Sequence, residues 1–308
     1  MSLMDTAERI KSMEIRGAGK IAREAAVALR DLAASLPKAG FASFLTEMKK
    51  AEQILLETRP TAVSLSNAIR FTLRGIEDAE TENDARLMVQ IQANSFIQSS
   101  NAALDKIAEI TAARIRDGDA VMTHCNSSAA LAGIIRAKEQ GKNITVFATE
   151  VRPWNQGRLT IKTLNDHAIP TIFIVDSAVR TFIPDVDLVI VGADAVTANG
   201  AVVNKIGTSQ IALAAKESRK NMIVAAETYK FSPQTMFGNF VEIEDRSPSE
   251  VIPDDILKTL PYVKVRNPVF DVTPAEYIDI IATEVGAIPP QLAYLIIKEN
   301  LGWKPEGI

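Results

Sequence analysis

The sequence predicts an α/β fold in which an all-helical N-terminal part precedes a part built on a mainly parallel β-sheet. Residues 1 to about 117 show helical periodicity and contain no convincing strand. From residue 119 onward, short apolar runs alternate with helical patterns, an order typical of a parallel sheet covered by helices on both faces. We therefore expect two domains, residues 1–117 and 118–308.

The N-terminal part is expected to contain several long helices. The first is alanine-rich and should end before Pro37, because proline disfavours helical conformation in the residue that precedes it. In the second, Phe44, Met48 and Leu55 fall on one face. The expected helices cover residues 21–36, 41–56, 61–76 and 83–116.

The second part is expected to alternate strands with helices up to a proline-punctuated tail that starts near Ser247. The expected strands cover residues 120–123, 144–148, 171–175, 188–191 and 222–225. The expected helices cover residues 129–140, 158–167, 178–182, 209–219 and 292–299.

The composition narrows the function classes. A net charge of -4 gives no general attraction to nucleic acid or membranes. One cysteine cannot form an internal disulfide, and one cysteine with two histidines speaks against a dedicated zinc site. We find no signal peptide and no apolar run long enough to span a bilayer, so a cytoplasmic location is the simplest expectation. We expect neither a metal nor a cofactor.

The only cysteine, Cys125, stands at a predicted corner between a strand and a helix. Open parallel sheets bind ligands at such corners, outside the carboxyl ends of the strands. Asn126, Ser127 and Ser128 are good helix caps, and a helix N-terminus favours both a phosphate and a thiolate. The alternative is a small buried cysteine without chemical function.

Two motifs of the helical part suggest anion binding. Arg16-Gly17-Ala18-Gly19-Lys20 places two glycines between cations, so that the backbone can approach a phosphate closely. A dinucleotide site is excluded because no βαβ unit surrounds this motif. The alternative interpretation of the motif is a plain turn between two helices. Arg59, which precedes Pro60, can equally mark a simple helix end.

Further polar groups follow the predicted strands. Residues 150–158 carry Arg152, Trp154, Gln156 and Arg158, which suit an anion site or a subunit contact. Asp194 follows the strand at 188–191 and can act as acid, base or loop cap. The remaining candidates are the cation-bearing segments Asn204-Lys205 and Tyr229-Lys230. These residues describe a pocket for a phosphorylated substrate, with proton transfer or nucleophilic attack as its chemistry.

The chain resembles one superfamily over almost its whole length. That superfamily contains methylthioribose-1-phosphate isomerases, archaeal ribose-1,5-bisphosphate isomerases and regulatory subunits of the eukaryotic translation-initiation exchange factor. The resemblance implies a Rossmann-like second domain with a mainly parallel β-sheet. The matching segments are Glu14–Ala18, Arg59–Val63, Thr123–Asn126, Arg152–Thr160, Val191–Asp194, Ala198–Gly200, Asn204–Thr208 and Phe270–Pro274.

The resemblance implies an enzyme, because the isomerases of this superfamily carry a catalytic cysteine and aspartate that correspond to Cys125 and Asp194. The motif Arg16-Gly-Ala-Gly-Lys20 departs from the Arg-Gly-Ala-Pro of methylthioribose enzymes, and this departure, together with the shorter chain, resembles the ribose-1,5-bisphosphate isomerases. Glu150-Val-Arg-Pro departs from the usual Glu-Thr-Arg-Pro. The alternatives are a methylthioribose-1-phosphate isomerase, against which Lys20 and Lys230 argue, and a non-enzymatic regulatory subunit of a translation initiation factor.

The implied reaction converts α-ribose 1,5-bisphosphate to ribulose 1,5-bisphosphate, and it links AMP breakdown to a RuBisCO. Asp194 would protonate the ring oxygen, while Cys125, as a thiolate whose pKa the following helix lowers, would move a proton from C2 to C1 through an enolate. The resemblance also implies a homo-oligomer, a hexamer that is a trimer of dimers, and allows activation by AMP. It places substrate contacts on Arg16, Gly17, Ala18, Gly19, Arg59, Ser127, Ser128, Ala129, Asn204, Lys205 and Lys230.

Overall fold

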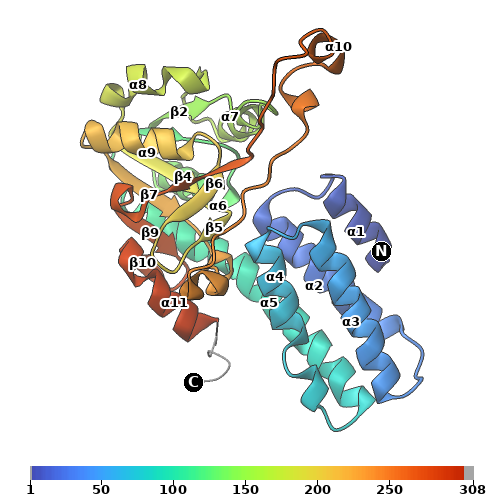
Figure 1. The fold of residues 1–308 in the computed structure, drawn as a ribbon. Coiled ribbons are helices and arrows are strands. Elements are labelled where there is room, and N and C mark those ends of the chain that lie inside the picture. The colour runs from blue at the N-terminus through green and yellow to red at the C-terminus, as the bar shows by residue number, and fades with distance from the viewer. Residues whose placement is uncertain (1, 302–308) are drawn as a thin grey trace. The chain divides into compact units, whose positions relative to one another are not determined.

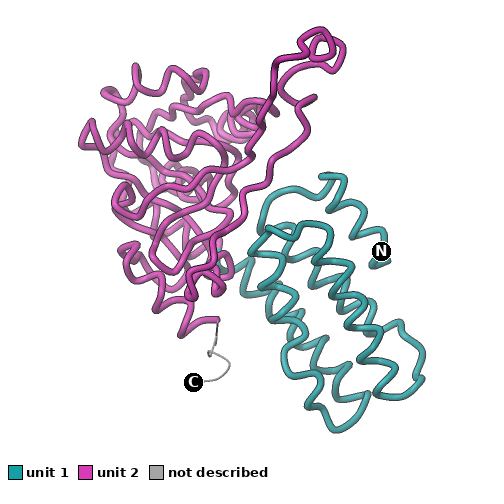
Figure 2. Tube along the Cα trace, in the orientation of Figure 1, with its two compact units in different colours: residues 1–103 teal, residues 104–308 magenta. Residues whose placement is uncertain are grey.

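The structure, a computed structural model, describes residues 2–301 of the chain. It divides into two compact units, residues 1–103 and 104–308 (Figure 2). The division falls inside the long helix α5 (Glu82–Ala112), and the domain boundary near residue 117 stays a prediction. Each unit has a hydrophobic core of its own.

Unit 1 is helical, as predicted, and adds a first helix, α1 (Leu3–Lys11), that the sequence-based prediction did not contain (Figure 1). Ser2 accepts a hydrogen bond from the Asp5 amide, and the Asp5 carboxylate accepts one from the Ser2 amide. This capping box satisfies amides that a helix start otherwise leaves free. The other helices of the unit are α2 (Ala18–Ser35), α3 (Phe41–Thr58), α4 (Val63–Leu73), the 3₁₀ turn η1 (Ile76–Asp78) and the first part of α5.

The core of unit 1 joins the apolar faces of these helices. Met48 and Leu55 of α3, on the face predicted from the sequence, are fully buried together with Leu29 of α2 and Leu65 of α4. Each such side chain contributes about 1.5–3 kcal/mol by leaving water.

Unit 2 contains the predicted parallel sheet. Its strand order is β10-β9-β7-β4-β1-β2-β3, and every neighbouring pair is parallel except β9 with β10. The strands are β1 (Ala120–Thr123), β2 (Thr145–Thr149), β3 (Thr171–Ile174), β4 (Leu188–Gly192), β7 (Asn221–Ala225), β9 (Ile280–Thr283) and β10 (Gly286–Ile288).

Helices cover both faces of this sheet. Successive strand residues point to opposite faces, so that a single strand contributes side chains to two separate hydrophobic cores. In β1, Met122 belongs to one core and Val121 to the other. The Met122 side is covered by α8, α9 and α11, and the Val121 side by the end of α5 with α6 and α7. The bounds of these helices are α6 (Ser128–Glu139), α7 (Gly157–Asp166), α8 (Val179–Phe182), α9 (Thr208–Glu217) and α11 (Ala293–Asn300).

A small antiparallel sheet, which the sequence did not predict, has the order β5-β6-β8. In it, Asn204 lies opposite Asp271 and Lys205 lies opposite Phe270. Its strands are β5 (Ala195–Val196), β6 (Val202–Lys205) and β8 (Phe270–Thr273). The remaining short elements are α10 (Asp254–Leu257) and the 3₁₀ turns η2 (Asp176–Ala178), η3 (Ile183–Asp185), η4 (Thr228–Lys230), η5 (Pro233–Phe237), η6 (Pro248–Glu250), η7 (Ala275–Tyr277) and η8 (Pro290–Leu292).

The strand order places a topological switch point between β1 and β4. The chain runs from β1 outward through β2 to β3, and then returns to the other side of β1 to form β4 and β7. In open parallel sheets the crevice at this point, outside the carboxyl ends of the strands, is the usual ligand site. The confirmed fold therefore predicts a site between the segments that follow β1 and β4. No helix within residues 2–301 is both long and apolar enough for a transmembrane span.

Candidate active site

Cys125 occupies a tight turn just after β1. Its φ of 67° is left-handed, a conformation that residues with a Cβ adopt rarely and that often marks a functional site. The turn is held by α7, because the buried Thr160 hydroxyl donates a hydrogen bond to the Cys125 carbonyl at 2.7 Å. Thr160 therefore supports the cysteine from 35 residues away in the sequence.

The thiol of Cys125 is held in its protonated form. Its Sγ donates to Oε1 of Gln156 at 3.6 Å, and the residue is half-buried. Burial raises the pKa of Cys125 to about 11, while Lys205 lowers this pKa and Asp194 raises it. The predicted lowering of this pKa by the following helix is therefore wrong for the free protein. The physical reason is burial, which is the largest contribution to this pKa. The helix α6 itself begins at Ser128, and Ser127 caps it by accepting from the Ala130 amide at 3.3 Å.

The raised pKa of Cys125 predicts slow alkylation at neutral pH. Since iodoacetamide reacts with the thiolate, a pKa of about 11 should make the rate at pH 7 roughly 10²-fold slower than that of a cysteine with an ordinary pKa. The rate should rise about tenfold per pH unit up to about pH 10. Mass spectrometry of the modified chain measures this rate at one site, because Cys125 is the only cysteine.

The urea-unfolded chain is the control for this measurement, since its thiol has an ordinary pKa. A rate in the folded protein that levels off below pH 8 would contradict the assignment, because it would show a stabilised thiolate.

His124 ties the cysteine turn to two other segments. Its Nδ1 lies 2.6 Å from Oγ1 of Thr149 at the end of β2, and its Nε2 lies 2.8 Å from the Ile206 carbonyl. A carbonyl only accepts, so Nε2 carries the proton and Nδ1 accepts from Thr149. Burial lowers the pKa of His124, so the ring is neutral at pH 7 and serves as a clamp.

Asp194 lies on the other side of the switch point, after β4. It is half-buried, and its amide donates to the Val203 carbonyl at 2.9 Å. Gly192 lets the two sides meet closely, because a Cβ there would lie 2.2 Å from Oγ of Ser127. The effect of Asp194 on the pKa of Cys125 shows that its charge acts on the thiol.

Asn204 and Lys205 bring β6 to the same site. Asn204 is buried and donates to Oγ1 of Thr208 at 3.0 Å. Nζ of Lys205 lies 5.0 Å from the centre of the Phe270 ring, a cation–π distance, and its charge lowers the pKa of Cys125. Unit 2 thus places a carboxylate, that of Asp194, and an ammonium group, that of Lys205, where both charges act on the Cys125 thiol.

Lys230 is buried and paired rather than solvated. Its Nζ lies 2.7 Å from Oε2 of Glu227, and the two side chains are 6% and 1% exposed. The Tyr229 hydroxyl donates to the other carboxylate oxygen of Glu227 at 3.0 Å. Burial raises the pKa of Glu227, but the Lys230 ammonium outweighs this, and the net pKa is below its ordinary value.

The glycine motif of unit 1 forms the start of a long helix. Gly17 is the N-cap of α2 with a φ of 86°, and Ala18 and Gly19 lie in its first turn. The Ala18 carbonyl accepts from Oγ of Ser64 at 3.0 Å. Arg59 ends α3, with Nη1 3.2 Å from Sδ of Met13. These predicted phosphate contacts therefore lie at helix ends within unit 1.

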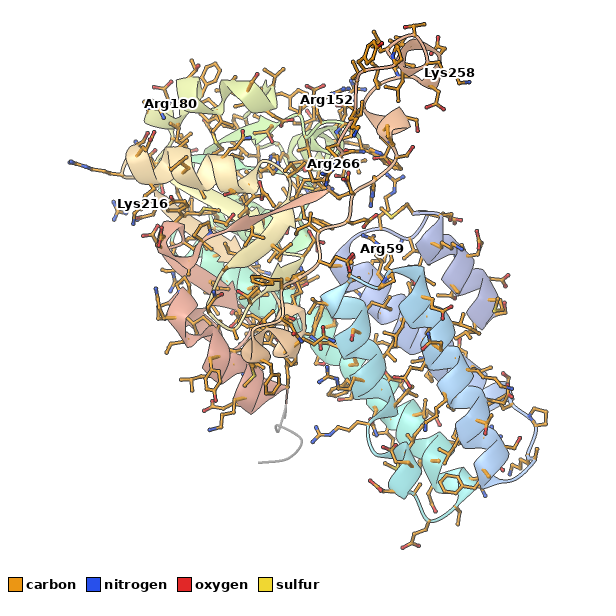
Figure 3. The ribbon with its side chains drawn as sticks, viewed as in Figure 1. Arg59, Arg152, Arg180, Lys216, Lys258 and Arg266 are labelled. Atoms are coloured by element: carbon orange, nitrogen blue, oxygen red, sulfur yellow. The ribbon has the colours of Figure 1, made fainter. Side chains whose placement is uncertain are left out.

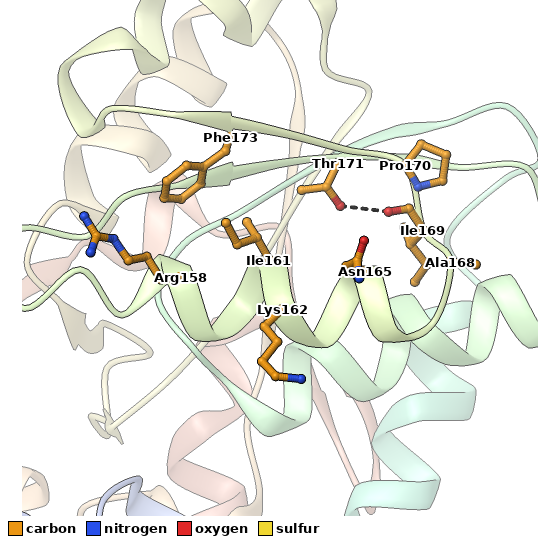
Figure 4. Close-up of a pocket in the computed structure, with 9 residues that line it drawn as sticks. All are labelled: Arg158, Ile161, Lys162, Asn165, Ala168, Ile169, Pro170, Thr171 and Phe173. Carbon is orange, nitrogen blue, oxygen red and sulfur yellow. Dashed lines mark hydrogen bonds between the residues drawn. The ribbon is translucent and has the colours of Figure 1, made fainter.

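The polar residues of the loop 150–158 lie in different surroundings, which the sequence alone could not distinguish. Gln156 contacts the thiol, whereas Arg152 is exposed (Figure 3). Arg158 lines a cavity of 680 Å³ between α7 and the edge strand β3 (Figure 4). Neither Cys125 nor Asp194 lines this cavity.

Sequence reasoning missed Asp176, which shapes that loop. Its carboxylate accepts hydrogen bonds from the amides of Val151 and Arg152, both at 2.8 Å. Its charge also raises the pKa of Cys125. Asp176 follows β3, so its position after a strand was the one signal that could have found it.

Comparison with known proteins gives a consistent grouping. The model of the Initiation factor 2 subunit family matches residues 14–290. A protein from Archaeoglobus fulgidus called ribose 1,5-bisphosphate isomerase is 56% identical over 98% of this chain and 94% of its own length. One of the same name from Methanocaldococcus jannaschii is 52% identical over 98% of this chain and 96% of its own. The solved structure of a Pyrococcus horikoshii protein titled translation initiation factor eIF-2B superposes with a TM-score of 0.80 at 31% identity, covering 94% of this chain and 97% of that one.

Proposed function

The chain belongs to the Initiation factor 2 subunit family, and from this premise we propose that it is a ribose 1,5-bisphosphate isomerase. It converts α-ribose 1,5-bisphosphate to ribulose 1,5-bisphosphate. The observation that carries this proposal is the placement of Cys125 and Asp194 after the two strands that flank the switch point, where their charges interact. The names of relatives that are 52% and 56% identical support the choice of sugar.

Substrate binding is proposed to use cations and helix starts. Asn204, Lys205 and Lys230 supply polar and charged contacts for a phosphate. The start of α6, formed by Ser127, Ser128 and Ala129, adds backbone amides and the positive end of a helix dipole. The residues of unit 1 proposed to bind substrate are Arg16, Gly17, Ala18, Gly19 and Arg59.

The chemistry must open a sugar ring whose C1 carries a phosphate, so the substrate cannot open as a free aldose does. We assign to Asp194 the proton that goes to the ring oxygen and the later uptake of a proton from the C2 hydroxyl. Cys125, as thiolate, takes the proton from C2 and returns it to C1 of the enolate. Each residue thus gives and receives one proton, and the pair is restored after each turnover.

The raised pKa of the free thiol is compatible with this assignment. The thiol of the free protein carries a proton, and the reactive form is proposed to carry a proton on Asp194 and none on Cys125. A cation beside the sulfur favours the thiolate, and Lys205 already lowers this pKa. Substrate binding is proposed to exclude water and to shift the proton between the two groups.

A second candidate is a regulatory subunit of a translation initiation factor. It is favoured by the structural likeness to the Pyrococcus horikoshii protein, with a TM-score of 0.80. A third candidate function is that of a methylthioribose-1-phosphate isomerase. The proton-transfer chemistry would be the same, and the substrate would carry a thioether in place of the 5-phosphate. The cations Lys20 and Lys230 argue for the bisphosphate.

The wider setting is proposed from the resemblance alone. The enzyme is placed in the cytoplasm, as a homo-oligomer that is a hexamer made of three dimers. Its proposed activator is AMP, and its reaction would serve AMP breakdown.

The test of the proposed function compares two sugars. We expect the purified protein to turn over α-ribose 1,5-bisphosphate with a kcat/KM about 10⁴-fold above that for methylthioribose 1-phosphate, because a site built for a charged group is left with unpaired partners by an analogue that lacks it. Product formation is followed by ³¹P NMR, with and without AMP. A preference for methylthioribose 1-phosphate would show that the thioether sugar, and not the bisphosphate, is the substrate. Absence of turnover with both, together with binding to an initiation-factor subunit, would replace the enzyme by the regulator.

A further inference from the structure

Asp271 of β8 caps a helix that belongs to another part of the fold. Its Oδ2 accepts hydrogen bonds from the amides of Gly207 at 2.8 Å and Ser209 at 3.1 Å. These amides lie at the start of α9, whose N-cap Gly207 makes no side-chain cap. A carboxylate here satisfies free amides and interacts favourably with the helix dipole.

The capped loop, residues 205–209, lies against the Cys125 turn. Gly207 has a φ of 104°, and a Cβ on it would lie 3.0 Å from Cε1 of His124. The Ile206 carbonyl accepts from the His124 ring at 2.8 Å. Lys205 begins the loop and lowers the pKa of Cys125. A displacement of Gly207 would therefore move both the clamp and the cation beside the thiol.

Strand β8 contacts this loop a second time through Phe270. The Phe270 ring lies under the Lys205 ammonium at 5.0 Å, and the two residues are directly opposite in the register of β6 and β8. Phe270 and Asp271, which are adjacent in β8, therefore contact Lys205 and Gly207 of the loop, respectively.

The cap is held in either charge state of Asp271. Its Oδ1 is buried without a hydrogen-bond partner, and burial raises the pKa of Asp271 to about 6. A proton on Oδ1 leaves Oδ2 free to accept from both amides. The position of the loop should thus depend on the acceptor atom rather than on the charge.

We propose that Asp271 is a positioning residue of the isomerase reaction, which keeps Lys205 and His124 in place beside Cys125 by fixing the loop 205–209. The inference rests on the proposed function for its turnover measurement. Asp271 itself need not touch the substrate.

The experiment uses full-length variants and a matched control. Asp271→Ala removes the acceptor, Asp271→Asn keeps it, and Thr273→Val changes a buried residue on the same face of β8 whose hydroxyl has no hydrogen-bond partner. For Asp271→Ala we expect kcat to fall about 10²-fold, the loss typical of a displacement of about 1 Å, with a smaller change in KM. Alkylation of Cys125 at pH 9 should slow at least threefold, because Lys205 no longer lowers its pKa.

The two comparison variants should behave differently from Asp271→Ala. Asp271→Asn should keep kcat and the alkylation rate within threefold of wild type, and Thr273→Val should leave both unchanged. Wild-type values in Asp271→Ala would overturn the proposal, as would an Asp271→Asn variant as impaired as Asp271→Ala or an equal loss in Thr273→Val.

Two safeguards keep the test decisive. If Asp271→Ala does not fold, Asp271→Val, which also lacks an acceptor and suits a strand, replaces it, and a wild-type kcat in that variant overturns the proposal. If the wild type turns over neither sugar, the proposed function fails, while the alkylation comparison still tests the positioning.

Discussion

Replacement of Cys125 by serine is expected to lower kcat for ribose 1,5-bisphosphate by about 10³-fold, because positioned acid–base groups contribute about 10²- to 10⁴-fold. Serine fits the same turn, but its hydroxyl is a far weaker acid than a thiol and cannot supply an anionic base. The substrate affinity should stay within about threefold, since the proposed phosphate contacts come from other residues. Single-turnover kinetics measures the first quantity and calorimetric titration the second.

This prediction fails if the Cys125→Ser variant retains a tenth of the wild-type kcat. It also fails if binding is lost together with turnover, because the residue would then hold the substrate or the fold. Ser99→Ala, on the solvent-exposed side of α5, provides a control in which a serine hydroxyl changes away from the chemistry.

Replacement of Lys230 by methionine is expected to lower the free energy of unfolding by about 3–5 kcal/mol, the usual cost of leaving one partner of a buried ion pair alone. The Glu227 side chain is 1% exposed and lies 2.7 Å from the Lys230 ammonium. Without that cation, its carboxylate would have to ionise in an apolar environment or take up a proton. Urea unfolding at pH 7 measures the loss.

The double variant Glu227→Gln, Lys230→Met separates stability from binding. It contains no buried charge at this position, so most of the lost stability should return. The KM for the bisphosphate should nevertheless stay raised, because the proposed phosphate contact is absent. A double variant as unstable as Lys230→Met would contradict the account of stability, and a wild-type KM would remove Lys230 from the substrate site.

The sequence predicted the strands β1, β2, β3, β4 and β7 of the main sheet because they are continuous apolar runs between clear helix signals, but it missed β9 and β10, which lie in the tail after Ser247. The strand at residues 120–123 was predicted with its observed bounds, and the cysteine corner followed from it. The order of the strands could not be predicted, since adjacency depends on tertiary packing. Only the observed order shows that Cys125 and Asp194 follow strands on the two sides of the switch point.

The small antiparallel sheet was missed because its strands are very short. β5 has two residues, and β8 lies in a proline-rich tail more than 60 residues from β6. Asp271 lies in a segment that matches the superfamily, but the sequence alone does not show that its side chain contacts the start of α9. The pKa of Cys125 was misjudged for a related reason. The sequence shows a nearby helix start, but burial and the charges of Asp194 and Asp176 depend on the folded structure.

The most direct test of the central claim is turnover of α-ribose 1,5-bisphosphate by the wild-type protein in D₂O, followed by ¹H and ³¹P NMR. Proton transfer by Cys125 through an enolate predicts that part of the ribulose 1,5-bisphosphate carries solvent deuterium at C1, because the thiol that has taken the C2 proton can exchange it with the solvent during the lifetime of the enolate. Product that retains the original C2 hydrogen at C1 in every molecule would indicate direct hydride transfer and contradict the mechanism. Absence of product would contradict the proposed function itself.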